Sequence, residues 1–389
     1  MNFHLNALGL VCAAGADPAG LAAALWADQP SGVQAEPWRD GRELHLGRVR
    51  AALPALDANP AFASRNNALL AAALQQIRPQ VDAAIARHGA TRVAVVLGTS
   101  TSGVGEAEQA WGEQARSGAL PAGFDIRQQE IGSPALYLAH RLGLGGPAFV
   151  VSTACSSSAK ALASAARLLR AGLADAVLCG GADSLCDFTV AGFAALEAVS
   201  GPRCNPMSAN RQGINIGEAA ALFLMEREGT GPRLAGWGES SDAHHISAPE
   251  PSGRGAEAAM RAALLMADLQ PADIGYLNLH GTATPHNDAM ESQAVARVFG
   301  LDLPCSSTKP LTGHTLGAAG ALEAAVAWLT LQGEGRLPVH HFDGARDPAL
   351  PAIRLVRPGE CLTRAPRAVL SNSFAFGGSN AALLLCRDD

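Results

Sequence analysis

The sequence predicts an α/β protein whose sheets are largely buried. Short runs rich in β-branched residues alternate with longer stretches rich in alanine and leucine, which is the pattern of strands followed by helices. Hydrophobic residues make up 48% of the 389 residues and charged residues only 16%, so a large interior and a small charged surface are expected. Only 5% of the residues are aromatic, and small side chains are therefore expected to let the elements pack closely.

The expected elements follow one another along the whole chain. The predicted strands cover residues 92–97, 148–152, 176–179 and 220–225. The predicted helices cover residues 66–77, 158–171, 255–267, 289–299 and 319–331.

The chain is predicted to consist of two related halves. A Glu-Gly-Thr-Gly break at 228–231 interrupts two strand-like runs and predicts domains at 1–229 and 230–389. Segments 149–169 and 304–329 both run from a strand through a loop of small polar residues into an alanine-rich helix. This matched order favours an internal duplication, although shared alanine richness is the simpler alternative.

The composition excludes several classes of protein. The net charge of −6 argues against nucleic acid as a partner, because phosphate binding needs a concentrated positive surface. No run approaches the roughly 20 apolar residues that cross a bilayer, and no lysine or arginine precedes Arg39, so neither a membrane span nor a signal peptide is expected. The eight scattered cysteines form no C-x-x-C pair, which predicts a reducing compartment, the cytoplasm.

Metal and dinucleotide sites are not expected either. The histidine pairs at 244–245 and 340–341 are adjacent in sequence, and no H-x-x-x-H or clustered Cys/His spacing occurs. The glycine-rich run at 142–146 precedes its strand, whereas a dinucleotide fingerprint follows one.

Cys155 is the first candidate for chemistry. It follows the apolar run at 148–152 and precedes a helix, so we expect it in a strand-to-helix turn near the helix N-terminus. Unpaired N–H groups there favour a thiolate and can hold the oxyanion of a thioester under attack. A buried structural cysteine is the alternative. The neighbouring serines suggest a serine hydrolase, but no G-x-S-x-G occurs.

His280 is the second candidate. An apolar strand at 276–279 delivers it, and Gly281 permits a tight turn before the hydroxyls of Thr282 and Thr284. Asp288 is the expected N-cap of the helix that follows. Taken alone, His280 is equally well interpreted as a hydrogen-bonded structural residue.

Lys309 and His314 stand five residues apart, just before the last predicted helix. Only two of the 29 basic residues are lysines, so a lysine retained against this bias is expected to do something that a guanidinium cannot. We expect Lys309 to orient a histidine or a carboxylate, and Lys160 to be a surface lysine. The glycines around His314 suggest a phosphate cradle, but G-x-x-x-x-G-K-[ST] is absent.

Phe374 and Phe376 precede two glycines and a strand near the C-terminus. They are either core residues or a movable gate beside an apolar pocket. The N–H of Phe376 would suit a second oxyanion donor.

With these segments in view, the sequence resembles the elongating β-ketoacyl-acyl-carrier-protein synthases of the thiolase-like superfamily. The matching stretches, in family order, are TACSSS (153–158), NIGEAAALFLME (215–226), HGTATPHND (280–288), STKPLTGHTLGAAG (307–320) and NSFAFGGSN (372–380). With looser matches they cover nearly the whole chain. The resemblance implies a thiolase-like fold, with two similar α/β halves in a five-layer α-β-α-β-α arrangement, usually as a dimer.

The resemblance also implies an acyltransferase reaction. Cys155 would take an acyl chain from a carrier protein as a thioester, and His280 and His314 would hold a malonyl thioester and promote loss of carbon dioxide. The resulting carbanion would attack the acyl group on Cys155. Further implied roles are the fixing of His314 by Lys309, contact with the phosphopantetheine arm by Thr282 and Thr284, support of the site by Glu323, and gating by Phe376. The substrates would be carried on phosphopantetheine, with no cofactor bound by the protein itself.

Departures from the family pattern concern the substrate. Ala283 stands where relatives more often carry glycine or serine, and Ala375 stands where they more often carry glycine. The stretch 201–213 lacks the Phe-Asp pair of the family pattern. These departures favour a specialised pathway, such as aryl polyene or polyketide assembly, over fatty-acid biosynthesis.

Several alternatives stay open for assembly and activity. The chain is expected to form a homodimer, or to be the catalytic member of a heterodimer with a chain-length-determining partner. A coenzyme A-dependent thiolase is less favoured, because no second cysteine stands in a C-x-G context near the C-terminus. A basic patch for an acidic carrier protein is expected, with Arg65, Arg116 and Arg127 as members.

Overall fold

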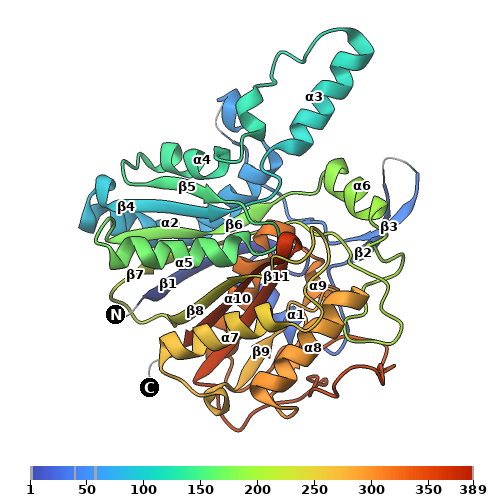
Figure 1. The fold of residues 1–389 in the computed structure, drawn as a ribbon. Coiled ribbons are helices and arrows are strands. Elements are labelled where there is room, and N and C mark those ends of the chain that lie inside the picture. The colour runs from blue at the N-terminus through green and yellow to red at the C-terminus, as the bar shows by residue number, and fades with distance from the viewer. Residues whose placement is uncertain (1–2, 39–40, 57–58, 388–389) are drawn as a thin grey trace.

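The computed structural model describes residues 3–38, 41–56 and 59–387, and its centre is one sheet of ten strands in the order β10-β9-β11-β12-β8-β1-β7-β6-β4-β5 (Figure 1). These strands are β1 (His4–Cys12), β4 (Val93–Gly98), β5 (Ala148–Val151), β6 (Ala176–Asp183), β7 (Ala219–Glu226), β8 (Arg233–Ser241), β9 (Tyr276–Asn278), β10 (Cys305–Ser306), β11 (Ala368–Ala375) and β12 (Ser379–Cys386). A separate pair consists of β2 (Gln34–Pro37) and β3 (Glu43–Leu46).

The sheet is built from two halves with the same topology. Counted within its own half, each has the strand order third, second, fourth, fifth, first. In each half the third, second and fourth strands are parallel neighbours, and the remaining pairs are antiparallel. Within the ten-stranded sheet, the halves are joined where β1 pairs with β8, at His4 and Arg233. This repetition supports the predicted duplication. The domain boundary at 229–230 stays a prediction, because both halves share one sheet.

The helices complete a five-layer arrangement, as predicted. Helices α2 and α4 pack on the first half, α7 with α8 beside it covers the second half, and α5 and α10 pack against each other between the halves (Figure 1). The helices are α1 (Pro18–Leu25), α2 (Arg65–His88), α3 (Val104–Ser117), α4 (Ser133–Leu142), α5 (Ser157–Arg170), α6 (Asp187–Ala195), α7 (Arg254–Ala267), α8 (Pro285–Phe299), α9 (Lys309–Thr312) and α10 (Ala319–Gln332). Within the described ranges, no helix is both long and apolar enough to cross a membrane.

Small residues bring the two central helices together. A Cβ atom on Gly320 of α10 would lie 2.6 Å from the backbone nitrogen of Ala159 on α5, so a larger residue there would force the helices apart. Both helices are rich in fully buried alanines, which a close-packed interior requires at such short separations. The close approach places the segments at the N-terminal ends of α5 and α10 side by side. These segments contain Cys155 and His314.

The predicted strands and helices are all present, with shifted ends. Helix α2 continues to His88, past Pro79, and is therefore longer than predicted. The N-cap prediction at Asp288 is wrong. Thr284 precedes the first residue of α8, Pro285, whose fixed φ suits the first helical position. Asp288 lies in the first turn, and its carboxylate accepts hydrogen bonds from the N–H groups of Met207 at 2.8 Å and Ala283 at 3.2 Å.

Candidate active site

Cys155 lies in the turn between β5 and α5, where the sequence places it. Ala154 adopts a left-handed φ of 50°, which turns the chain sharply before the helix. The Ser157 hydroxyl accepts from the Thr153 N–H at 2.9 Å and donates to the Ala154 carbonyl at 2.6 Å. The turn is thus fixed by its own hydrogen bonds, and the sulfur is buried at the N-terminal end of α5.

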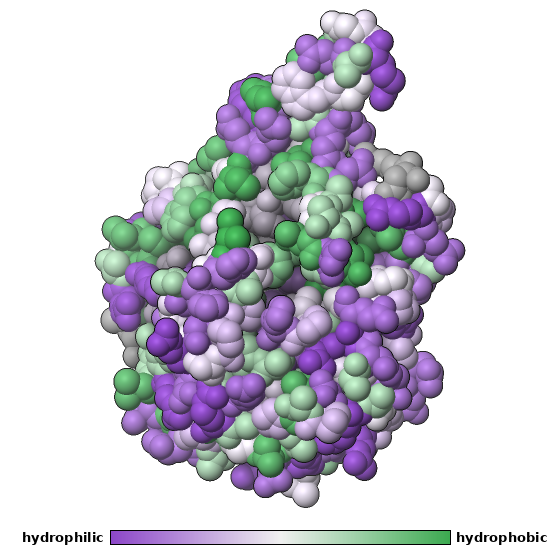
Figure 2. Space-filling view, turned by 45° about the vertical axis from the view of Figure 1, so that its right-hand side comes forward, coloured by the Kyte–Doolittle hydropathy of each residue, from purple (hydrophilic) through white to green (hydrophobic). Residues whose placement is uncertain are grey.

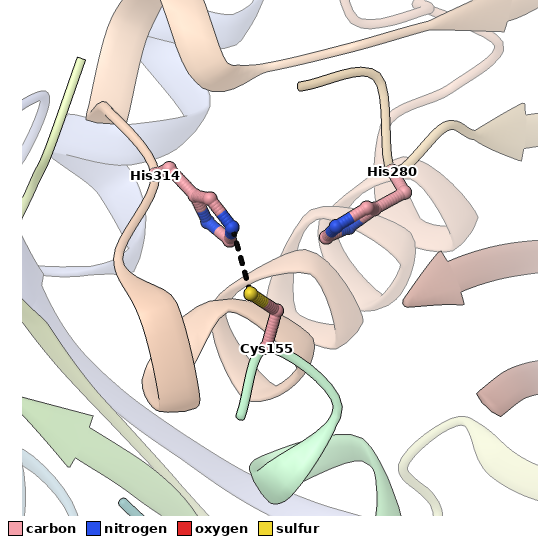
Figure 3. A group of neighbouring side chains, drawn as sticks. All are labelled: Cys155, His280 and His314. Carbon is pink, nitrogen blue, oxygen red and sulfur yellow. Dashed lines mark hydrogen bonds between the residues drawn. The ribbon is translucent and has the colours of Figure 1, made fainter. Parts of the chain in front are cut away.

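The structure brings Cys155, His280 and His314 together from distant parts of the chain (Figure 3). The Nε2 atom of His314 lies 3.1 Å from the sulfur of Cys155. The ring centroids of His280 and His314 are 5.3 Å apart, with an interplanar angle of 81°. All three side chains are buried, so they face one another across a space from which bulk water is largely excluded.

Glu291 holds the backbone of His280 in place. Its carboxylate accepts from the N–H of His280 at 2.8 Å and from that of Gly281 at 2.7 Å. Gly281 has a φ of 43°, and a Cβ there would lie 2.5 Å from the Cβ of Ser307, so only glycine fits this turn. Glu291 was not expected to belong to the site, because a glutamate inside a predicted helix carries no distinctive signal.

Lys309 contacts His280. Among the described residues, Lys309 forms no hydrogen bond with His314, where the contact was predicted. The Lys309 ammonium donates to the carbonyl of His280, lies 3.4 Å from His280 Nδ1 and forms an ion pair with Glu323. The first residue of α9 is Lys309 itself, which follows β10 next to the end of β9. The short separation of Lys309 and His314 in the sequence therefore does not bring their side chains into contact.

This contact determines the tautomer of His280. An ammonium group only donates, so His280 Nδ1 is the acceptor and the ring proton resides on Nε2. The Nε2 atom has no hydrogen-bond partner among the described residues and is buried. His280 therefore presents an unused N–H donor beside the sulfur of Cys155.

Burial controls the charges in the site. It lowers the pKa values of His280 and His314 well below 6.5, with the Lys309 cation as the second cause, so both rings are neutral at pH 7. Burial also raises the pKa of Cys155 to about 12, against the opposing effects of Lys309 and of the Phe376 N–H. The stabilised thiolate expected from the sequence is thus not found, because desolvation outweighs the N-terminus of α5.

The predicted aromatic gate adjoins the sulfur. The N–H of Phe376 is directed at Cys155, and the Phe376 ring lies 5.5 Å from that of Phe193 on α6. The ring of Phe374 is buried 6.2 Å from His280. Phe193 was not anticipated from the sequence.

These groups line a cavity of about 450 Å³. Phe193 and Ile214 contribute apolar lining, while Thr282 and Thr284 contribute hydroxyls whose oxygens are 2.9 Å apart. Figure 2 shows apolar side chains gathered around a hollow below the projecting α3 region. A larger cleft of about 660 Å³, which includes Arg203, contains none of the predicted catalytic side chains.

Asp183 is a second buried carboxylate that was not expected from the sequence. It accepts from the side chains of Thr99, Ser100 and Thr101 and from the Gly317 N–H at 2.5 Å. It thereby ties the loop after β4 to the glycine-rich segment beyond His314. A carboxylate ending the apolar strand β6 was the available signal.

The expectation that no metal site is present was based on spacing in the sequence. The sulfur of Cys155 and one ring nitrogen each of His280 and His314 lie within 4.8 Å of one another, a cluster in space that such spacing rules do not detect. The arginines expected to form a basic patch are each paired instead, Arg65 with Glu218, Arg116 with Glu113 and Arg127 with Asp125. A basic patch for a carrier protein at these three arginines stays a prediction.

Comparison with known proteins gives consistent matches. A model of the β-ketoacyl synthase N-terminal domain matches residues 67–230, and one of the C-terminal domain matches residues 233–343. Nodulation protein E of Rhizobium sp. (strain N33) is 33% identical, over 97% of each chain. The 3-oxoacyl-[acyl-carrier-protein] synthase 2 of Rhizobium meliloti (strain 1021) is 38% identical over 63% of this chain and 62% of its own.

A solved structure is similar over the whole chain. It is the ketosynthase ApeO in complex with its chain length factor ApeC from Xenorhabdus doucetiae. A chain of this complex aligns with a TM-score of 0.95 and 46% identity, covering 100% of this chain and 98% of that one.

Proposed function

The chain belongs to the β-ketoacyl synthase family, and we propose that it joins an acyl group on Cys155 to a malonyl-derived unit by decarboxylative Claisen condensation. One observation carries the proposal. A thiol, an imidazole 3.1 Å away and a second imidazole with a free N–H donor share one buried cavity. Such a site combines a nucleophile with neutral donors for a developing oxyanion.

The first step is acyl transfer. Because Cys155 is a thiol at neutral pH, its proton passes to His314 Nε2 as the sulfur attacks the thioester carbonyl of acyl-carrier protein. The N–H groups of Cys155 and Phe376 hold the tetrahedral oxyanion. The carbon–sulfur bond to phosphopantetheine then breaks, and the departing sulfur takes the proton from His314. The cavity mouth, with Thr282 and Thr284, accommodates the phosphopantetheine arm.

The second step is decarboxylation and condensation. The malonyl thioester oxygen accepts from His280 Nε2–H and lies against His314, while the bond to the carboxylate breaks and carbon dioxide leaves. The electron pair forms an enolate, whose carbon attacks the acyl-Cys155 carbonyl. Collapse of this intermediate releases the 3-oxoacyl-carrier protein and the Cys155 thiolate, which regains a proton from solvent. Lys309 and Glu323 orient His280 throughout.

We test the function by incubating the protein with acyl-carrier protein and then malonyl-carrier protein. Intact-mass spectrometry should show one acyl group on Cys155, followed by a 3-oxoacyl product two carbons longer and an equal amount of carbon dioxide. Release of free fatty acid, or an adduct on another cysteine, would contradict the proposal.

The pathway and the compartment are proposed from the relatives and from the thiols. The similarity to a ketosynthase that is complexed with its chain length factor supports a heterodimer, and the departures at 201–213, Ala283 and Ala375 support a specialised polyene or polyketide-type pathway. All eight cysteines are free, and seven of them are buried, which supports a reducing compartment such as the cytoplasm.

We propose the free edge of β5 as the surface for a related partner chain. Strand β5 pairs only with β4 within the described chain, and Phe149 on it is 38% exposed. Ile131 and Leu136 of the neighbouring segment are also exposed. An exposed apolar edge strand favours pairing with another chain. A chain length factor is the proposed partner, and a second copy is the alternative.

Replacing Phe149 with aspartate should therefore weaken assembly. We expect a shift toward monomer in sedimentation velocity, with the apparent dissociation constant raised about tenfold or more. The reason is that the interface loses an aromatic ring that assembly would bury and gains a charge that assembly would bury instead. Leu265→Asp, on exposed α7 in the other half, is the control and should assemble like the unmodified protein. Equal effects of both substitutions would remove the assignment of this edge.

A further inference from the structure

Lys160 is not the surface lysine that the sequence suggests. It lies on α5, is half-buried and donates to the hydroxyl of Ser379 at 2.6 Å. The Ser156 oxygen, one helical turn earlier, lies 3.1 Å from the same hydroxyl, while its own O–H also points to the Thr153 carbonyl at 2.9 Å. Two polar side chains on one face of the nucleophile helix therefore contact a single oxygen of another segment, and Lys160 is the donor of the shorter contact.

Ser379 ends the turn that carries the gate. The turn Phe376–Gly378 connects β11 to β12 and leads directly into Ser379. Gly377 and Gly378 have φ values of 80° and 72°, and a Cβ on Gly377 would meet no atom within 4 Å. The turn therefore faces open space at Gly377, whereas a Cβ on Gly378 would lie 2.7 Å from the Cβ of Asp242. Its N-terminal residue, Phe376, supplies the N–H directed at Cys155.

The turn is anchored from two sides. On the β8 side, backbone bonds join Gly377 to Ile246 at 2.8 Å and Gly378 to Asp242 at 2.9 Å. On the α5 side, Lys160 and Ser156 contact the end of the turn through the Ser379 hydroxyl. Ile246 is itself 81% exposed, whereas most residues of α5 are buried.

We propose that Lys160 is a positioning residue that holds the Phe376–Gly378 turn closed over Cys155 through its hydrogen bond to Ser379. It acts on the nucleophile through the turn and does not touch the reacting atoms. The inference rests on the proposed function only where it treats the turn as a gate for the acyl chain. A lysine suits the position because a single flexible ammonium reaches one hydroxyl, whereas a planar guanidinium is built for bidentate partners.

The test measures access to Cys155 without carrier protein or malonyl groups. The purified protein, in its assembled form, is treated with N-ethylmaleimide. Peptide mass spectrometry then measures the rate at which Cys155 is labelled. Lys160→Met keeps the apolar stem and removes the donor, and Ser379→Ala removes the acceptor. Each should speed labelling of Cys155 about tenfold, the effect expected for loss of one hydrogen bond to a charged group.

Three controls isolate the hydrogen bond. The exposed Cys361 should be labelled at one rate in all variants. Arg170→Met, on the same helix, removes one positive charge from a residue that packs on Trp237 and should leave Cys155 labelling unchanged. If both partners act through one bond, the double variant Lys160→Met/Ser379→Ala should also show about a tenfold increase, because effects within one interaction do not multiply.

The outcomes decide the inference separately from the function. Labelling of Lys160→Met at the unmodified rate, with an unchanged melting temperature, would overturn it, as would a roughly hundredfold increase in the double variant. Should Lys160→Met fail to fold, the rate for Ser379→Ala alone decides. Absence of condensation activity in the unmodified protein would contradict the proposed function while leaving the labelling result intact.

Discussion

Cys155→Gln should still release carbon dioxide from malonyl-carrier protein while forming no 3-oxoacyl product. Decarboxylation needs the Nε2–H donor of His280, which this substitution leaves in place. Condensation needs an acyl group on sulfur, which glutamine cannot carry. Cys155→Ala should likewise lose the acyl adduct and lower condensation by about 10⁴-fold or more, the loss typical of a removed nucleophile. Product mass spectrometry and carbon dioxide release measure the two steps independently.

Cys361→Ala is the matched control for this experiment. Cys361 is the exposed cysteine of the chain, whereas Cys155 is buried in the site. We expect both rates of this variant to match those of the unmodified protein. Persistence of a labile acyl adduct in Cys155→Ala would place the nucleophile elsewhere, and loss of decarboxylation in Cys155→Gln would mean that the sulfur takes part in that step as well.

The local surroundings of the reactive residues were predictable from sequence. Cys155 and His280 stand at the ends of short apolar runs, and such runs predict strands whose ends deliver side chains to a sheet edge. The five-layer arrangement was predicted through the family resemblance, and the alanine-rich pattern at Gly320 and Ala159 explains how the central helices approach closely enough to produce it.

The contacts between segments were not predictable. Lys309 is five residues from His314 in sequence but bonds to His280, because the parallel pairing of β9 and β10 brings their ends together. Glu291 and Asp183 are ordinary acidic residues in sequence, and only the fold aims backbone N–H groups at them. The raised pKa of Cys155 has the same origin, since burial depends on every element that covers the sulfur.

Lys309→Met should have the largest effect on stability, because it leaves the carboxylate of Glu323 buried without its cation. Removing one partner of a buried ion pair costs about 3–5 kcal/mol of unfolding free energy. Burial raises the pKa of Glu323 to about 7, and Lys309 opposes this rise. Without Lys309 the pKa of Glu323 should rise further.

The sign of the pH dependence follows from linkage. The folded-state pKa of Glu323 lies above the value of roughly 4.3 in an unfolded chain, so the folded state holds an extra proton between the two values. Stability is therefore lost as pH rises through this window, and in Lys309→Met the loss extends to higher pH. Urea unfolding should therefore show a larger cost of Lys309→Met at pH 8 than at pH 6.

The double variant Lys309→Met/Glu323→Gln separates stability from chemistry. Glutamine removes the buried charge, so most of the unfolding free energy at pH 8 should return. Decarboxylation should stay about 100-fold below that of the unmodified protein, because no ammonium remains to hold the proton of His280 on Nε2. Recovery of activity together with stability would show that Lys309 only neutralises Glu323, and the assignment of the His280 donor would then fall with it.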